Sequence, residues 1–146
     1  MGVFYVDCTV ENMASRDKSA TIEQLLVDTG SEFTWLPEEA LERIEVGIQK
    51  RDEQFVMANG GIITRDIGYA ILRVDGFETV DEIVFARDGD LNLLGSRTLE
   101  GFGAVVDARG KRLVAAGPHL AARVAQVVNL RSNSKAKRKL TTCATS

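Results

Sequence analysis

The sequence predicts a mostly β domain, and two observations lead to this fold class. Turn dipeptides of the Asn-Gly and Asp-Gly kind recur at short intervals through the middle of the chain. Between these turns lie short runs rich in β-branched and aromatic residues, which are typical of the strands of a meander or small barrel. The length of 146 residues, of which 45% are hydrophobic, suits one such domain with one core.

The expected strands follow from these runs. In the N-terminal part, two strands are joined by the polar loop 11–19, and a third apolar run begins directly after a tight turn at residues 28–31. A glycine-containing hairpin is expected around residues 55–62. The strands are expected over residues 3–10, 20–27, 33–36, 62–64, 69–74, 79–85 and 104–106.

Short helices are expected at three places, two of them inside the domain. One begins after Pro37, which is followed by acidic residues in the first turn. The second covers Ser96–Gly101, with Ser96 as its cap and Gly101 as its stop signal. A third is expected over residues 118–130, where apolar residues recur at helical spacing.

Charge is unevenly distributed along the chain. The last sixteen residues, 131–146, contain five of the 18 basic residues and none of the 21 acidic ones, so residues 1–130 carry a formal charge of −8. The basic tail is polar, and we expect it to be disordered. An acidic body does not favour a nucleic-acid platform, so nucleic acid is not an expected partner.

The N-terminal segment does not resemble a secretory signal. It has no basic start, and Asp7 interrupts its apolar run. No window of the sequence approaches 18 uninterrupted apolar residues, which excludes a typical membrane-spanning helix. We therefore expect a cytoplasmic protein without a membrane partner.

Neither a metal site nor a cofactor is expected. Cys8 and Cys143 lie near opposite ends of the chain, and His119 is the single histidine. Two free thiols are therefore the favoured interpretation, and a redox or metal role for them is a remote alternative. The aspartates of residues 88–92 resemble a calcium loop, but glycine and glutamate are missing at the sixth and twelfth positions, so we interpret this segment as a hairpin.

The segment Leu25–Ser31, LLVDTGS, contains the strongest candidate site. Its three apolar residues without polar alternation are typical of a strand buried on both faces. The strand ends in Asp28, and Gly30 permits a tight turn and a close backbone approach. Thr29 and Ser31 supply hydroxyl groups that hydrogen-bond to the backbone or to a neighbouring carboxylate. An aspartate that only caps its own turn is the structural alternative.

The segment LLVDTGSEFTWLP resembles the active-site loop of the retroviral-type (retropepsin-like) aspartic proteases. Further along the chain, the hairpin at 55–62 is similar to the flap of that family, and Leu93-Leu94-Gly95 is similar to its paired apolar residues plus glycine, with a short helix directly after them. The segments GYAILRVDGF, LLGSRTLEGFG and VVDARGKRLV resemble small microbial single-domain members. The resemblance covers about residues 3–117, so we assign residues 1–117 to the protease-like domain.

The resemblance implies a retropepsin-like half-barrel that acts as an aspartic endopeptidase, without a cofactor, on a protein or peptide substrate. Such enzymes use two aspartates that share a proton, one as the base that activates water and the other as the acid. This chain contains one Asp-Thr-Gly and is too short for two lobes. The second Asp28 is therefore expected from a second copy in a C2 homodimer.

The resemblance also implies roles for the residues of the loop. Asp28 of each subunit binds the nucleophilic water, and Thr29 ties the two active loops together across the dimer. Gly30 leaves room and an amide beside the carboxylates. Ser31 is expected to hydrogen-bond the outer carboxylate oxygen.

Residues outside the loop are expected to support it or to cover the substrate. Leu93, Leu94 and Gly95 are expected to pack behind the loop. The flap tip is expected at Asn59, Gly60 and Gly61, and closes over the substrate. Met57 and Ile62 are expected to line the pocket from the flap, whereas Phe33 and Trp35 are expected in the core.

Two features depart from the retroviral pattern. Ser96 separates Gly95 from Arg97, where retroviral enzymes commonly place an arginine directly after the glycine. The chain also continues past Val114, so the dimer edge is expected to be built differently. A non-catalytic dimeric peptide-binding or scaffold module on the same fold is the alternative function, because fold alone does not decide function.

Overall fold

The computed structural model describes residues 3–121. Residues up to Ala116 belong to one compact unit, and residues 117–121 contain no helix or strand. Most of the third expected helix, residues 122–130, and the basic tail 131–146 lie outside the described residues.

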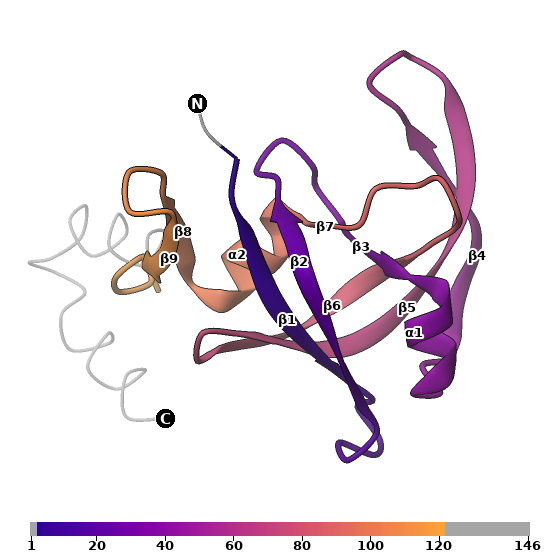
Figure 1. The fold of residues 1–146 in the computed structure, drawn as a ribbon, viewed down its shortest axis with the longest axis horizontal. Coiled ribbons are helices and arrows are strands. Elements are labelled where there is room, and N and C mark those ends of the chain that lie inside the picture. The colour runs from indigo at the N-terminus through magenta and orange to yellow at the C-terminus, as the bar shows by residue number, and fades with distance from the viewer. Residues whose placement is uncertain (1–2, 122–146) are drawn as a thin grey trace, which may run out of the picture. The chain divides into compact units, whose positions relative to one another are not determined.

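The prediction of a mostly β fold is confirmed. Nine strands and two short helices follow one another along the compact unit (Figure 1). They are β1 (Tyr5–Glu11), β2 (Ser19–Val27), β3 (Thr34–Pro37), α1 (Glu38–Arg43), β4 (Ile48–Val56), β5 (Ile62–Val74), β6 (Phe77–Ala86), β7 (Leu93–Leu94), α2 (Ser96–Phe102), β8 (Ala104–Asp107) and β9 (Arg112–Ala115).

Seven strands form one sheet in the order β1-β2-β7-β3-β6-β5-β4, and β8 and β9 form a separate hairpin. The sheet closes on itself because β1 also pairs with β5, through Thr9–Glu11 and Ile71–Arg73. The strand β4 pairs with the first half of β5, on the same edge that β1 uses further along. The closed part of the sheet surrounds the main core.

The core forms where side chains of the closed sheet alternate inward. In β1, the side chains of Val6, Cys8 and Val10 are buried, although a bulge between Val6 and Cys8 shifts the register with β2. Leu25 and Leu94 are fully buried on the neighbouring strands. This burial of apolar area stabilises the fold and fixes which face of each strand points inward.

The long hairpin of β4 and β5 projects from the closed part of the sheet (Figure 1). At its tip, the Met57 amide donates to the Gly61 carbonyl at 2.8 Å, and the Gly60 amide donates back to the Met57 carbonyl at 2.8 Å. Gly60 has a φ of +86°, a conformation that glycine adopts without strain. The hairpin expected around residues 55–62 is therefore present, but its arms are longer than expected.

The hairpin expected at residues 88–92 is a loop, because the flanking strands β6 and β7 lie on opposite sides of β3 and do not pair with each other. Several expected boundaries were also wrong. The separate strands 62–64 and 69–74 are one strand, β5, because Arg65–Gly68 also pair with β4 or β6. The charged segment 48–54 was not expected as a strand, since backbone pairing with β5 rather than apolar side chains holds it there.

The helix α2 begins and ends one or two residues away from the expected signals. Gly95 occupies the N-cap position with no side-chain cap, so Ser96 is the first helical residue rather than the cap. The helix passes through Gly101, where an added Cβ would meet the Thr79 hydroxyl, and ends at Gly103, which has a left-handed φ of +67°.

Candidate active site

The sheet topology sends Asp28 off the end of β2 into a short crossing loop. The strands β2 and β3, which enter and leave this loop, do not pair with each other but flank β7 on its two sides. Val27 is in parallel register with Leu94, and Trp35 is opposite Leu93. The loop 28–33 therefore passes over the end of β7, and the Asp28 amide donates to the Leu94 carbonyl at 2.9 Å.

The first residues of α2 hold this loop from behind. The amide of Ser96 donates to the Ser31 carbonyl at 2.7 Å, and the amide of Arg97 donates to the Glu32 carbonyl at 3.1 Å. The backbone at position 95 lies so close to the backbone of the loop that only glycine fits there. An added Cβ on Gly95 would lie 2.8 Å from the Glu32 carbonyl oxygen and would also clash with the backbone of Phe33.

The Asp28 carboxylate is half-buried at the surface of the loop. Its Oδ1 atom accepts a hydrogen bond of 2.9 Å from the Gly30 amide, the only one that the described residues give this carboxylate. Thr29 is exposed. The Ser31 hydroxyl donates to the Phe33 carbonyl at 3.1 Å, so it stabilises the loop backbone instead of the outer carboxylate oxygen.

Asp28 lies at the edge of a groove of about 860 Å³ that the projecting hairpin covers on one side. Phe33, Trp35 and Phe55 form its aromatic floor, which brings together the loop 28–33, β3 and the hairpin arm β4. The Phe55 ring meets Phe33 edge-on at 5.4 Å and Trp35 at 5.1 Å between centroids. Trp35 is buried in a small core cluster and Phe33 packs partly buried against it, as expected, and both side chains also line the groove.

The expected flap residues divide into two groups. Met57 lines the groove together with Val56 and Ala58. Asn59, Gly60 and Gly61 form the exposed turn at the tip, and Ile62 is 62% exposed and is not part of the lining. Of the residues expected behind the loop, Leu94 and Gly95 are buried there, whereas Leu93 also reaches the groove.

A second aspartate, Asp90, lines the groove but has different surroundings. Both of its carboxylate oxygens accept hydrogen bonds from Arg65, at 2.7 and 2.8 Å, and the Arg87 amide donates to Oδ2 at 2.8 Å. The Arg65 guanidinium lowers the pKa of Asp90 below its usual value, with a smaller contribution from the Arg87 amide and against the opposing effect of burial. Asp90 is thus held as a charged, paired carboxylate.

Arg97 contacts the loop 28–33 and β6 of its own chain. Its guanidinium lies 4.6 Å from the centre of the Phe33 ring and donates to Glu82 at 2.9 Å. Lys50, on the hairpin arm, donates to the other Glu82 oxygen at 2.6 Å. The pKa of Glu82 is lowered, mainly by its hydrogen bond with Lys50 and to a smaller extent by Arg97, whereas burial acts in the opposite direction and raises it. Arg97 thus links the loop 28–33 to β6 and, through Glu82 and Lys50, to the β4–β5 hairpin.

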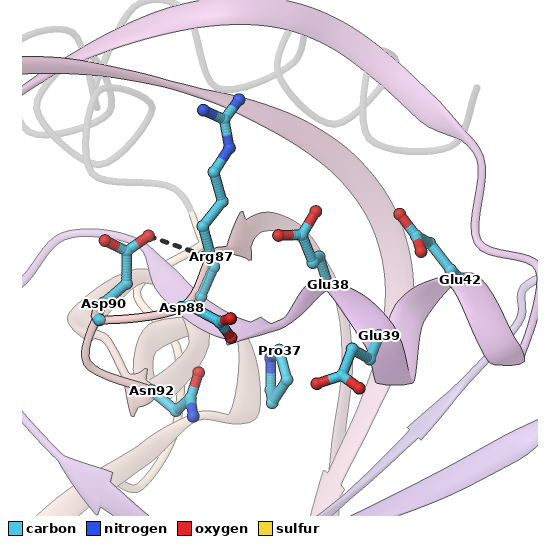
Figure 2. Close-up of a pocket in the computed structure, with 10 residues that line it drawn as sticks. Pro37, Glu38, Glu39, Glu42, Arg87, Asp88, Asp90 and Asn92 are labelled. Carbon is cyan, nitrogen blue, oxygen red and sulfur yellow. Dashed lines mark hydrogen bonds between the residues drawn. The ribbon is translucent and has the colours of Figure 1, made fainter.

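A second hollow shares Gly89 and Asp90 with the groove (Figure 2). Pro37, carboxylates of α1 and carboxylates of the loop 87–92 line it, and the Arg87 side chain extends away from them. The labelled acidic residues are Glu38, Glu39, Glu42, Asp88 and Asp90. Within residues 3–121, no three His, Cys, Asp or Glu side chains converge closely enough to hold a metal ion.

Sequence reasoning missed several residues of the site. Phe55, Glu32 and Glu53 line the groove, and Arg65 pairs with Asp90, but no role in the site was expected for any of them. Phe55 and Glu32 lie within segments that carry the family resemblance, whereas Glu53 and Arg65 belong to no motif. Phe55, near the hairpin tip, was the one usable signal, because a large aromatic side chain on an otherwise charged strand is usually buried against other residues.

No helix in the described part of the chain is both long and apolar enough to cross a bilayer. Comparison with protein-family models and with curated proteins finds no match to this chain.

Proposed function

We propose that this protein is an aspartic endopeptidase that acts as a C2 homodimer with one Asp28 from each subunit. The observation that supports this most strongly is the position of Asp28. Its carboxylate is half-exposed in a groove, on a loop that three backbone hydrogen bonds attach to Leu94, Ser96 and Arg97. A rigidly held and accessible carboxylate in an aromatic groove fits water activation beside an extended peptide.

The need for a second subunit follows from the chemistry of the groove. An aspartic dyad requires one charged and one protonated carboxyl group in contact. Asp90 does not fit the role of the acid, because Arg65 holds it in the charged form with two hydrogen bonds. The exposed Thr29 and the half-exposed Asp28 carboxylate fit a symmetric contact, in which the same loop of the partner supplies the second Asp28.

In the proposed mechanism, a water molecule lies between the two Asp28 carboxyl groups. The charged carboxylate removes a proton from this water while the water oxygen forms a bond to the scissile carbonyl carbon, and the protonated carboxyl group donates its proton to the carbonyl oxygen. The resulting tetrahedral diol collapses when the carbon–nitrogen bond breaks. The leaving amine takes the proton that the first carboxylate removed from water, and the second carboxylate recovers a proton from a diol hydroxyl, which restores the dyad. The β4–β5 hairpin is well placed to cover the peptide and exclude bulk water.

The test compares the wild-type chain with Asp28→Asn on a diverse peptide mixture from pH 4 to 7. Mass spectrometry identifies the products, and light scattering measures the oligomeric state of the same samples. Asparagine keeps the shape of the side chain but removes the shared proton, so we expect cleavage to fall by about 10³-fold or more without loss of the dimer. A matched control is Asp75→Asn, on the exposed turn between β5 and β6, which is expected to cut normally.

Three outcomes decide between the candidate functions. Cleavage by wild type and by Asp75→Asn, but not by Asp28→Asn, supports the protease. Folded dimers that cut nothing favour the non-catalytic peptide-binding module. Equal cleavage by Asp28→Asn and wild type would rule Asp28 out as the catalytic group.

A further inference from the structure

A chain of hydrogen bonds runs through the interior directly beneath the active loop. The Gly95 amide donates to the Thr34 hydroxyl at 2.9 Å, and the hydroxyl groups of Thr34 and Thr98 lie 2.6 Å apart. The Thr98 hydroxyl donates to Asp81 Oδ2 at 2.8 Å. Both threonines are fully buried. These hydrogen bonds connect Gly95 and α2 with β3 and β6, which lie earlier in the sequence.

The direction of every proton in this chain follows from counting donors. A hydroxyl group has one proton to give. The Thr98 proton goes to Asp81, so the contact between the two hydroxyl groups is made by the Thr34 proton. Thr34 accepts in turn from the Gly95 amide. Asp81 is the final acceptor, and its other oxygen accepts from the Glu82 amide at 2.7 Å. Each buried polar group in the chain is satisfied in this one arrangement.

The backbone that this chain fixes is the same backbone that holds Asp28. Gly95 lies between Leu94, whose carbonyl accepts from the Asp28 amide, and Ser96, whose amide donates to the Ser31 carbonyl. Thr98 lies in the same first turn of α2 as these contacts. A shift of this segment would therefore move the loop that positions the Asp28 carboxylate.

We propose that Thr34 and Thr98 are positioning residues for Asp28, acting through the directed hydrogen-bond chain from the Gly95 amide to Asp81. This inference rests on the proposed protease function. Neither threonine touches the groove, and neither is among the residues that line it. Their role is to keep the Leu94–Arg97 segment, and with it the active loop, in one position.

The test uses Thr98→Val, which keeps the shape of the side chain but removes its hydroxyl group, and Thr98→Ser, which keeps the hydroxyl. Val10→Ala serves as the control for general loss of stability. Val10 is buried near the far end of β1, opposite Ala20 and Leu72. We expect Thr98→Val to lower kcat by about tenfold or more with KM changed less than about threefold, because the reacting geometry is lost while the groove is kept. Thr98→Ser should restore kcat to within about threefold of wild type.

A second measurement follows amide hydrogen exchange and does not need catalysis. In Thr98→Val, the amides of Asp28, Gly95, Ser96 and Arg97 should exchange at least about tenfold faster than in Val10→Ala of matched stability. If Thr98→Val does not fold, Thr34→Val tests the same chain, because it removes the acceptor of the Gly95 amide.

The outcomes separate this inference from the proposed function. If wild type cleaves no peptide, the proposed protease function fails, and selective exchange at the four amides still decides whether the chain holds the loop. If wild type cleaves and Thr98→Val keeps its kcat within twofold, the positioning role is overturned. A uniform rise in exchange, equal to that of Val10→Ala, would also overturn it.

Discussion

At the scale of single residues, Asp28 and Asp90 line the same groove but differ in what surrounds them. Asp28 accepts one hydrogen bond from an amide of its own loop, whereas Asp90 accepts three and is paired with Arg65. A carboxylate that is paired with a guanidinium gives up its proton readily and does not take it back near neutral pH. The surroundings, rather than the residue type, therefore decide which aspartate suits acid–base chemistry.

Cys8 provides a prediction at the same scale. Its side chain is fully buried, and burial raises the pKa of the thiol to about 12. Because the thiolate is the reactive form, Cys8 should not react with a maleimide at pH 7.5 in the folded protein. In Cys143→Ser, where Cys8 is the single thiol, we expect no labelling in buffer and complete labelling in 6 M guanidinium, as measured by mass spectrometry.

The maleimide-treated sample also distinguishes an aspartic protease from a cysteine protease. Peptide cleavage by Cys143→Ser should be unchanged after treatment with maleimide, since the proposed mechanism uses no thiol. Rapid labelling of the folded protein would contradict the burial of Cys8, and loss of activity on labelling would argue for a cysteine-dependent reaction.

At the scale of elements, the loop 87–92 is held to β5 by the Arg65–Asp90 pair. Both side chains are mostly buried, with exposures of 15% and 11%, so solvent screens the pair little. The pair fixes one wall of the groove, because Gly89, Asp90 and Leu91 all line it. The β4–β5 hairpin, in contrast, packs on the aromatic side chains of the groove through Phe55, and the Lys50–Glu82 ion pair links its arm β4 to β6.

The Arg65–Asp90 pair predicts how stability depends on pH. The folded pKa of Asp90 is lowered below its value in the unfolded chain, so its stabilisation is complete above about pH 4 and is lost as the pH falls through the folded pKa. At pH 7, Asp90→Asn should reduce the free energy of unfolding by about 1.5–3 kcal/mol. Urea unfolding at pH 7 and pH 3, at one protein concentration, measures this difference.

We expect the difference between Asp90→Asn and wild type to shrink as the pH falls below about 4, because the aspartate of the unfolded chain then takes up a proton while the folded Asp90, with its lowered pKa, does so only at lower pH. Asp75→Asn, in an exposed turn, serves as the control and should change stability little at either pH. A difference for Asp90→Asn that stays constant from pH 7 to pH 3 would contradict the pairing.

At the scale of the whole molecule, the proposed active site is complete only when two chains meet. The chain has one Asp-Thr-Gly, and the described residues bring no second unpaired aspartate to Asp28. Exposed apolar side chains flank the groove on both rims, with Val56 74% exposed on the hairpin and Leu91 69% exposed on the facing loop. Such side chains fit a partner subunit or a peptide substrate.

Mixing of subunits tests this requirement directly. Wild type and Asp28→Asn are unfolded together in equal amounts and refolded, so that the chains pair at random. If each site needs two Asp28 side chains, about one quarter of the activity of the same total amount of wild type should remain, because only wild-type homodimers are active. A site complete within one chain would retain about one half. An equal mixture with Asp75→Asn should remain fully active.

Much of the fold was accessible from the sequence because it depends on local patterns. Turn dipeptides marked the hairpins, the run Leu25–Val27 marked a buried strand, and Pro37 marked the start of α1. The ends of α2 and the length of β4 were not accessible. The helix boundary depends on the close contact of Gly95 with the loop backbone, and β4 depends on its pairing with β5.

The sequence by itself determined the mostly β fold, the position of Asp28 at the end of a buried strand, and the glycine-rich hairpin. These features follow from residue types and spacing over a few positions. Only the tertiary structure decided that Phe33 and Trp35 line the groove, that Asp90 is neutralised by Arg65, and that Thr34 and Thr98 connect Gly95 to Asp81. The physical reason is that burial and hydrogen-bond partners come from strands that are neighbours in the sheet but distant in the chain.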